Sequence, residues 1–583
     1  MNHRRKAVIF ITTCIIITSL INVLIKEAWT IQVQASSFFL DSNRKKVVVI
    51  MVDSIELQDF AKNDYLSYLF NNSYSSLISG RQSSKSTIAK AKLAIGAGKR
   101  LELNNGLRNT TNYNDNIELL DNQIIVGEKG NVIYRDIKYL KKQNEGNGYD
   151  SYVGYLGSKL KQYHKTTCLI GNSDTDIMNR SSVLIAMDKN GIVDIGDVEN
   201  TTKPDSHFPG GKKTDFGKLT SLYKQYIGIS DFTVIDTGDL IRLDYYKNQI
   251  SKEEFAIHKA ETIYNIAEFT RNIIANTNQK TTFILLSSYP SKSNLQSGLK
   301  ISPILIFDND GQGHIYSQST RRTGIITNLD IADYILDKLI DTETANLKLV
   351  PSAEPFETML SLTIKLLNIS KLRLPVLTWY AIFEIICAMA GLLYMFNLNN
   401  QSNKLINLVK ITMLVNIVAP VVLLYMSIFE ISSKSIYFGL FILISFIVAA
   451  LLFLLIKTII GQFLGAALLV NISIIIDLLR GSTFIKNSVF GYDPIIGARF
   501  YGIGNEFAGV FIGSGILLAG CLLQYFRNFT EKKSKITTML LIIYCGFQLF
   551  IMGMPFIGSN FGGTIAGVVA YFFFFCSIRQ KKI

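Results

Sequence analysis

Apolar residues are distributed very unevenly along this chain of 583 residues. One apolar run lies near the start, a long mixed stretch follows, and the C-terminal part consists almost entirely of apolar runs. A membrane span needs about 20 mostly apolar residues, and the run 7–25 has that length. Seven further runs of this kind are 374–397, 407–428, 436–456, 459–479, 507–526, 537–557 and 562–578. We therefore expect a multi-pass membrane protein with eight spans and one large soluble domain between the first two.

Basic residues indicate which side of the membrane each loop occupies, because Lys and Arg in short loops stay on the cytoplasmic side. An N-terminus inside the cell places all the basic clusters in the cytoplasm. These are MNHRRK (1–6), the loop around Lys404, Lys457, RNFTEKKSK (527–535) and RQKKI (579–583). We therefore expect both termini in the cytoplasm and the soluble domain outside the cell membrane. The predicted division is an anchor at 1–27, an extracytoplasmic domain at 28–372 and a seven-span domain at 373–583.

The first apolar run has an alternative interpretation as a cleaved signal peptide. Val33-Gln34-Ala35 is a small-residue sequence of the kind that signal peptidase recognises. Against cleavage, the apolar run is long for a signal peptide, and this sequence lies well beyond its end. An uncleaved anchor is the favoured interpretation.

Cysteine use and charge limit the function classes. Only Cys168 lies in the soluble domain, so no disulfide can form within it and its apolar core must hold it together. The sequence pI near 9.2 partly reflects the cytoplasmic clusters, so the net charge of +14 does not indicate a nucleic-acid partner. Membrane lipid is the expected partner of the apolar spans.

The soluble domain has the pattern of an α/β fold. Short continuous apolar runs, which are typical of strands buried on both faces, alternate with helical stretches such as 254–276 and 330–341. The runs are VVVIMV (47–52), TTCLIG (166–171), FTVI (232–235), TFILL (282–286) and SPILIF (302–307). This alternation predicts a doubly wound, mainly parallel sheet covered by helices.

Three aspartates follow such strands. Ligands of open α/β sheets bind at the carboxyl ends of the strands, where Asp53, Asp174 and Asp236 are expected. Each aspartate alone is explained as a helix cap or turn residue. Three of them at one edge of the sheet favour a site.

Several segments of this domain resemble the alkaline phosphatase superfamily. VVVIMVDS is similar to its first strand, and RQSSKSTIAKAKLAIGAGKR (81–100) to its nucleophile region. GNSDTD (171–176), DTGDLIRLD (236–244) and STRRTGIITNLDIADYIL (319–336) are similar to bacterial membrane proteins with a phosphatase-like outer domain. The resemblance covers about 45–345. It implies a doubly wound α/β sandwich and, in active members, two divalent metals beside a covalent phospho- or sulfo-enzyme site.

Thr87 is the candidate nucleophile. It precedes a helix-forming run, so its hydroxyl is expected at a helix N-terminus, which favours an anion, and Arg81 and Lys85 could contribute positive charge to substrate binding. The alternative is that Thr87 or Ser86 is only an N-cap. Both interpretations stay open.

The expected metal ligands are Asp53, Asp236, Asp239 and Asp174. The superfamily implies a divalent metal, with Mg²⁺, Mn²⁺ or Zn²⁺ as candidates, and an all-carboxylate set would suit Mg²⁺, Mn²⁺ or Ca²⁺ better than Zn²⁺. The chain departs from the family where a late strand is followed by Ser287-Ser288-Tyr289 in place of an Asp-His pair. This departure leaves a domain without metal as an equal alternative.

The loop 480–506 between two spans is long and polar. Its sequence RGSTFIKNSVFGYDPIIGARFYGIGNE contains Asp493, Arg499, Asn505 and Glu506. Polar groups near membrane depth usually mark function or pair with one another. We expect Arg499 to pair with Asp493 or Glu506, and Asn505, Glu506 and Arg499 are candidate substrate-binding residues.

Two functions fit these observations. The first is a cell-envelope hydrolase or phosphotransferase that acts on a phosphorylated lipid or a lipid-linked or surface polymer at the outer leaflet. The second is a catalytically degenerate domain that serves as a binding or scaffolding module for envelope assembly or transport.

Overall fold

The computed structural model describes residues 46–80, 87–103, 110–113, 118–120, 123–125, 128–146, 153–277, 280–308, 311–396, 403–526 and 531–580. The described residues divide into two compact units. One contains the α/β domain up to Ile364 together with Ile495–Gly497, and the other contains the remaining C-terminal residues from Lys365. The predicted first span and the candidates Arg81 and Lys85 lie outside the described residues.

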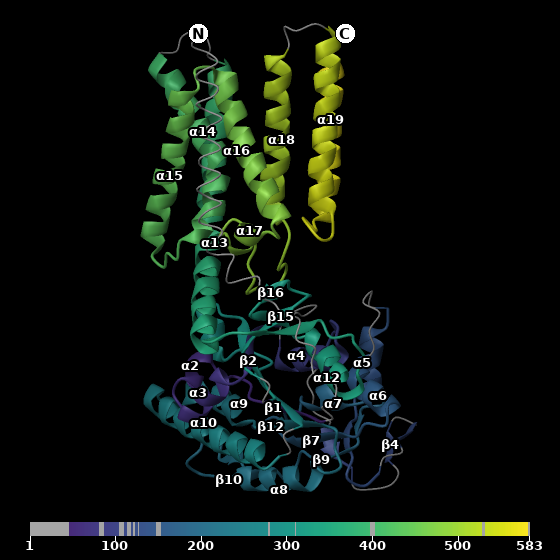
Figure 1. Ribbon diagram of the computed structural model, residues 1–583. Coiled ribbons are helices and arrows are strands. Elements are labelled where there is room, and N and C mark those ends of the chain that lie inside the picture. Colours follow the sequence, from purple (N-terminus) through teal and green to yellow (C-terminus); the bar gives the residue numbers. More distant parts are fainter. Residues whose placement is uncertain are drawn as a thin grey trace. The chain divides into compact units, whose positions relative to one another are not determined.

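The α/β domain is built on an 11-stranded sheet (Figure 1). Its main path runs β16-β15-β2-β14-β13-β1-β12-β7-β9, while β17 pairs with β2 and β18 with β15. The strands are β1 Lys46–Met51, β2 Tyr74–Ser79, β7 Thr167–Gly171, β9 Ile195–Asp197, β12 Phe232–Asp236, β13 Thr281–Leu286, β14 Ile301–Phe307, β15 Gly313–Ser317, β16 Arg322–Thr323, β17 Ile325–Thr327 and β18 Leu347–Pro351. The five apolar runs that the sequence singled out are all strands of this sheet.

The strands that carry the candidate site are parallel. β1 pairs in parallel with β12 on one side and with β13 on the other, and β7 pairs in parallel with β12. The expectation of a mainly parallel sheet differs from the structure at β14, which is antiparallel to both β13 and β2. Only a short connection with the small helix α11 (Lys292–Ser297) joins β13 to β14, and antiparallel neighbours can be joined this way.

Helices cover both faces of the sheet. Val47, Val49 and Met51 of β1 belong to one core cluster, while Val48 and Ile50 are equally buried but lie outside it. Successive strand residues point to opposite faces, so both faces of β1 are covered. The helices are α2 Leu57–Phe60, α3 Asp64–Asn71, α4 Ile88–Ala97, α5 Ile137–Asn144, α6 Tyr155–Gln162, α7 Val183–Ala186, α8 Phe216–Tyr226, α9 Asp239–Tyr246, α10 Lys252–Ala275, α11 and α12 Asp330–Ile340. The predicted α/β class and the predicted helices at 254–276 and 330–341 are confirmed.

Smaller strands lie outside the main sheet. They are β3 Thr110–Asn112, β4 Glu118–Leu120, β5 Gln123–Ile125, β6 Val132–Tyr134, β8 Ile192–Val193, β10 Thr202–Pro204 and β11 Lys212–Thr214. The β3-β6-β8 group matters for the site, because its first strand carries Thr110 and Asn112 beside the loop that follows β7.

The C-terminal unit is helical. Seven of its described helices are long and apolar enough to cross a membrane, in agreement with the seven C-terminal spans expected from the sequence. The helices are α13 Pro355–Phe396, α14 Asn403–Tyr425, α15 Lys434–Leu455, α16 Ile459–Leu479, the short α17 Thr483–Asn487, α18 Asn505–Tyr525, α19 Glu531–Gly553 and α20 Phe561–Gln580. The predicted domain boundary at 372 falls inside the continuous helix α13.

Candidate functional sites

The carboxyl ends of four neighbouring parallel strands meet at one edge of the sheet. Ser288 follows β13, Asp53 follows β1, Asp236 ends β12, and Ser173 follows β7. All four side chains are buried. The expectation that Asp53 and Asp236 lie at one edge of the sheet agrees with this geometry, which follows from the parallel register Met51↔Asp236.

A lysine lies between the two aspartates. The Lys92 ammonium is 2.9 Å from Asp53 Oδ2 and 3.4 Å from Asp236 Oδ2, and it donates to Ser182 Oγ at 3.0 Å. Its side chain has a relative exposure of 0%. Lys92 comes from α4, and this helix is almost entirely buried from Lys90 to Ala97. The cation that compensates the two carboxylates is therefore supplied by the chain itself.

Hydroxyl and amide donors complete the cluster. Asp53 Oδ1 accepts from both the backbone amide and the hydroxyl of Ser288, each at 2.6 Å. Asp236 Oδ1 accepts from Ser173 Oγ at 2.7 Å, and Oδ2 accepts from Ser182 Oγ at 2.5 Å. Such donors stabilise the ionised form of a buried carboxylate. The cluster is a compact network of two carboxylates, one ammonium and three serines.

The pKa shifts agree with this charge arrangement. Burial alone would raise the pKa of Asp236, but Lys92, Ser182, Ser173 and Arg242 together hold this pKa below its ordinary value. Burial alone would lower the pKa of Lys92, but the attraction of the two aspartates raises it. Both shifts favour the charged forms of Lys92 and Asp236.

Asp239 belongs to a separate buried ion pair. Its carboxylate accepts from Arg242 Nη1 at 2.6 Å and from the backbone amide and hydroxyl of Thr214 at 2.8 and 2.9 Å. Arg242 also donates to both oxygens of Asn172 and to the Asp174 carbonyl, which fixes the start of the loop after β7. Burial raises the pKa of Asp239 despite the opposing effects of Arg242 and Thr214.

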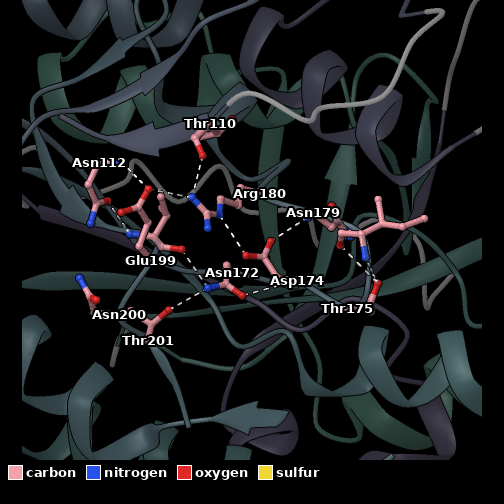
Figure 2. Close-up of polar contacts among 12 residues, drawn as sticks. Thr110, Asn112, Asn172, Asp174, Thr175, Asn179, Arg180, Glu199, Asn200 and Thr201 are labelled. Carbon is pink, nitrogen blue, oxygen red and sulfur yellow. Dashed lines mark hydrogen bonds and ion pairs between the residues drawn. The ribbon is translucent and has the colours of Figure 1, made fainter. Parts of the chain in front are cut away.

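Asp174 organises the same loop (Figure 2). Its carboxylate accepts from Arg180 Nε at 3.1 Å and from the Asn179 amide at 2.7 Å, which closes the loop on itself. Arg180 Nη1 donates to the Thr110 carbonyl at 2.7 Å and to Glu199 Oε1 at 3.2 Å. The locked loop presents Ser173 at one end and Ser182 at the other, and both reach Asp236. Asp174 therefore positions the loop that supplies donors to the cluster.

Thr87 caps the helix that carries Lys92. It is the N-cap of α4, and its hydroxyl accepts from the Lys90 amide at 3.2 Å. Its exposed position at the start of a 10-residue helix fits the N-cap interpretation and also leaves the nucleophile interpretation open. The role of Thr87 as a nucleophile stays a prediction, and so do the roles of Arg81 and Lys85.

The four aspartates do not form a divalent metal site in this arrangement. A metal bridging Asp53 and Asp236 would need the position that the Lys92 ammonium takes, and Asp239 and Asp174 are each paired with an arginine. Within the described residues, no group of three or more His, Cys, Asp or Glu side chains is placed to hold a metal ion. The residues present therefore do not fit the metal centre that the family resemblance implies.

Lys92 was not predicted as a site residue, although the sequence carries a signal for it. The segment IAKAKLAIGA has two lysines within an otherwise small and apolar helix. Such a helix buries most of its surface, so a lysine within it must find a buried carboxylate. Lys92 finds the buried Asp53 and Asp236, while Lys90 pairs at 3.0 Å with Glu102, which is only partly buried.

A second polar cluster lies in the helical unit. Arg373 of α13 forms an ion pair with Glu506 in the first turn of α18, and its Nη1 donates to the carbonyls of Val489 at 3.0 Å and Gly491 at 2.6 Å. Asp493 accepts from Ser370 Oγ at 2.6 Å. These contacts join α13 to the loop before α18.

The predicted pairing of Arg499 is wrong. Within the described residues its guanidinium donates to the Ser559 carbonyl at 3.1 Å and forms no ion pair with Asp493 or Glu506. Arg373 pairs with Glu506 in place of Arg499, because Arg373 lies at the start of the α13 span, within reach of the α18 N-terminus. Arg373 was not predicted as a partner, since it flanks a span and lies outside the polar loop 480–506.

The loop before α18 is held against the turn before α20. Asn560 Nδ2 donates to the Ile503 carbonyl at 3.1 Å and to Asn505 Oδ1 at 3.2 Å. Gly502 has φ +75°, and a Cβ there would lie 2.2 Å from the Gly558 carbonyl oxygen, so only glycine fits. Asn505 is exposed and Glu506 is half-buried, which leaves this end of α18 accessible.

Comparison with solved structures finds chains described as alkaline phosphatases, as a member of their superfamily and as a lipoteichoic acid synthase. A protein of the alkaline phosphatase superfamily from Vibrio parahaemolyticus is 13% identical, with 52% of this chain and 68% of that chain covered and a TM-score of 0.33. An alkaline phosphatase variant from the Antarctic bacterium TAB5 with bound Mg is 12% identical, with 51% and 98% covered and a TM-score of 0.31. The lipoteichoic acid synthase LtaP from Listeria monocytogenes is 11% identical, with 54% and 76% covered and a TM-score of 0.31.

No family model matches the sequence, and no curated protein matches it. The structural neighbours include alkaline phosphatases and a member of their superfamily.

Proposed function

We propose that this multi-pass membrane protein uses its phosphatase-like domain as a metal-independent binding or scaffolding module of the cell envelope. The observation that carries the proposal is the Lys92 ammonium between Asp53 and Asp236. In hydrolytic sites a divalent metal acts as a Lewis acid that lowers the pKa of a bound oxygen nucleophile. A lysine ammonium only donates hydrogen bonds and neutralises charge, so it cannot supply this activation to a hydroxyl such as that of Thr87.

The burial of the cluster supports the same proposal. Lys92, Asp236, Ser173 and Ser182 each have a relative exposure of 1% or less. Each carboxylate oxygen already has a lysine or serine neighbour, so a substrate phosphate would have to displace native contacts before it met any of them. The cluster therefore serves to hold the edge of the sheet together, and binding is expected on the exposed surface around it.

The enzyme alternative requires Lys92 to move. A metal-dependent hydrolase or phosphotransferase would need the ammonium to leave the two carboxylates and a divalent ion to take its place. Thr87 would then be the nucleophile, and Arg81 and Lys85 would bind the phosphate. This alternative gives measurable consequences that the binding module does not, namely stoichiometric metal and a phosphatase activity that needs Thr87.

The expected setting is the outer leaflet. The charge distribution supports cytoplasmic termini and an extracytoplasmic domain, which would place the domain next to membrane lipid and to lipid-linked or envelope polymers. Accessibility of single engineered cysteines tests this orientation in intact cells. Labelling by a membrane-impermeant maleimide at Lys203, an exposed residue of the α/β domain, supports it, and labelling at Lys535 instead would overturn it.

The deciding experiment measures metal content and metal response of the full chain in detergent. We expect less than one tenth of an equivalent of Mg, Mn, Zn or Ca by elemental analysis after purification without chelator. We also expect no rise in the unfolding temperature with added Mg²⁺, Mn²⁺ or Zn²⁺, and no hydrolysis of p-nitrophenyl phosphate above background. One equivalent of metal together with hydrolysis that is lost in Thr87→Ala would establish the enzyme alternative and refute the binding module.

A further inference from the structure

A carboxylate lies in the middle of the α13 span. Glu384 is exposed on α13, which runs from Pro355 to Phe396 as one helix. It is 11 residues beyond Arg373 and 12 before Phe396, or about 17 and 18 Å along the axis at 1.5 Å per residue. A carboxylate at this depth facing lipid is costly, and such residues nearly always face protein.

The helix face around Glu384 carries small residues, which allow a second helix to pack closely against it. Ala381 and Ala388 lie three residues before and four residues after it, so the three side chains share one face. Both alanines are exposed within the described structure. Small residues let the backbones of two membrane helices approach closely, so this face suits a neighbouring helix better than lipid.

Polar groups of the adjacent helix accompany the carboxylate. Tyr380 lies one turn before Glu384, close enough to hydrogen-bond it, and its hydroxyl donates to the Asn416 carbonyl of α14 at 3.2 Å. The Asn416 Oδ1 atom is buried and has no hydrogen-bond partner among the described residues. A buried amide oxygen without a donor is unfavourable, so a polar contact at this seam between α13 and α14 is missing among the described residues.

We infer that the seam formed by Ala381, Glu384, Ala388 and Asn416 is the docking site of the chain's own first apolar segment, residues 7–25. This segment lies outside the described residues and is the remaining stretch of the sequence that is long and apolar enough to span. It enters the membrane before the α/β domain and α13 returns after it, so the two spans are antiparallel. The ends at Ala7 and Phe396 then lie at the same membrane surface.

The depths of the polar residues match. Thr18 and Ser19 are 11 and 12 residues from Ala7, or about 17 and 18 Å, and Glu384 is about 18 Å from Phe396. Their hydroxyls are donors for a carboxylate, and interhelical hydrogen bonds of this type hold membrane helices together. The same arithmetic places Cys14 about 11 Å and Ala388 about 12 Å from the shared surface.

The test is a cysteine crosslink in the full chain within native membranes. The starting protein keeps Cys14 and has its other cysteines replaced by serine. Ala388→Cys is compared with Ile386→Cys, a control that is 56% exposed, nearly at the same depth and on the opposite face. Copper phenanthroline or a short bis-maleimide should join Cys14 to the introduced cysteine within one chain for Ala388→Cys and at least fivefold less for Ile386→Cys. Cys14→Ser should abolish the product.

A second measurement tests the role of Glu384. In the Ala388→Cys protein, Thr18→Val with Ser19→Ala should lower the crosslink yield at least threefold, whereas Thr13→Val should not. A dimer-sized product joining two introduced cysteines would mean that a second copy covers the seam and would overturn the inference. So would equal yields from both faces, no intramolecular product, or a mature chain whose N-terminus begins after Ala35.

Discussion

Lys92 of α4 and Asp53 after β1 form an ion pair of 2.9 Å that is shielded from solvent at both ends. In the same cluster Asp236 lies 3.4 Å from the Lys92 ammonium. Ligands of open α/β sheets bind at the carboxyl ends of the strands, and in this chain the cation beside the two carboxylates at this edge is Lys92. The pair therefore links the position of a helix to the ends of two central strands.

Replacing Lys92 should make the protein respond to metal. Lys92→Ala leaves Asp53 and Asp236 buried without a cation, which we expect to cost about 3–5 kcal/mol of unfolding free energy. The space and charge that remain suit Mg²⁺ or Mn²⁺, so millimolar Mn²⁺ should raise the unfolding temperature of Lys92→Ala by several degrees and leave the wild type unchanged. Circular dichroism of the full chain in detergent measures both effects.

The control for this prediction uses the same helix. Lys90 pairs with Glu102, whose side chain is 24% exposed. Lys90→Ala should therefore destabilise the protein less and create no response to Mn²⁺. A wild-type protein that responds to Mn²⁺ as strongly as Lys92→Ala would show that the ammonium does not take the place of a metal.

Acid should weaken the β1–β12 edge through Asp236. Its pKa in the folded protein is below the ordinary 3.8. A carboxylate with a lowered folded pKa contributes stability above its unfolded pKa and loses it as pH falls through the folded pKa. Protection of β1 and β12 peptides from amide hydrogen exchange should therefore fall below about pH 4, and this fall should be shallower in Asp236→Asn.

Asp239 should change the pH dependence of stability in the opposite direction to Asp236, so it serves as the matched comparison. Burial raises its folded pKa above 3.8, so its charged form weakens the fold at neutral pH and protonation relieves this as pH falls through the raised value. Asp239→Asn should then make the acid-induced loss of protection steeper than in the wild type. Parallel pH profiles for the two variants would contradict the assigned shifts.

Replacing Asp174 should loosen the loop 172–182 and leave the metal content of the protein unchanged. Asp174→Asn removes the charge that Arg180 Nε and the Asn179 amide contact. A hydrogen-bonded charged pair of this kind contributes about 1.5–3 kcal/mol, so peptides from 172–182 should exchange their amide hydrogens markedly faster. Arg180→Lys should produce a similar effect, because lysine cannot reach Asp174, Glu199 and the Thr110 carbonyl together. Unchanged exchange in both variants would show that the loop is held by other contacts.

Periodicity and strand-end chemistry were enough to predict the α/β class, the seven C-terminal spans and the shared edge of Asp53 and Asp236. Continuous apolar strands and membrane spans leave strong local signals, and parallel register brings strand ends together. The side chains that pair with these aspartates could not be predicted in the same way. Whether Asp53 meets a metal or Lys92 depends on how α4 packs over the sheet, which is a long-range contact without a local signature.

The membrane loop illustrates the same limit. Arg499 is the nearest arginine in sequence to Asp493 and Glu506, and sequence distance favoured it as their partner. The structure instead uses Arg373, which is 133 residues from Glu506. Helix packing decides which arginine reaches the α18 N-terminus, where a carboxylate in the first turn is also favoured by the helix dipole.

Variants of the Arg373–Glu506 pair should distinguish a structural role from a binding role at this end of α13 and α18. Arg373→Met removes a guanidinium that binds Glu506 and two carbonyls, so the amount of folded protein extracted from membranes should fall severalfold. Glu506→Gln keeps the shape and a hydrogen-bond acceptor for Arg373, so it should be extracted at near wild-type levels. Asn505→Ala, which removes one part-buried contact to Asn560, should also leave the level unchanged.

Binding then distinguishes the two roles in the well-folded variants. If this end of α18 contacts a lipid-linked or polymer ligand, Glu506→Gln and Asn505→Ala should lower the recovery of co-purified lipid phosphate, measured per mole of detergent-extracted protein. Glu506 is half-buried and Asn505 exposed, so both can reach a ligand while Arg373 holds the helix end in place. Wild-type recovery of lipid phosphate in both variants would limit this cluster to a structural ion pair between α13 and α18.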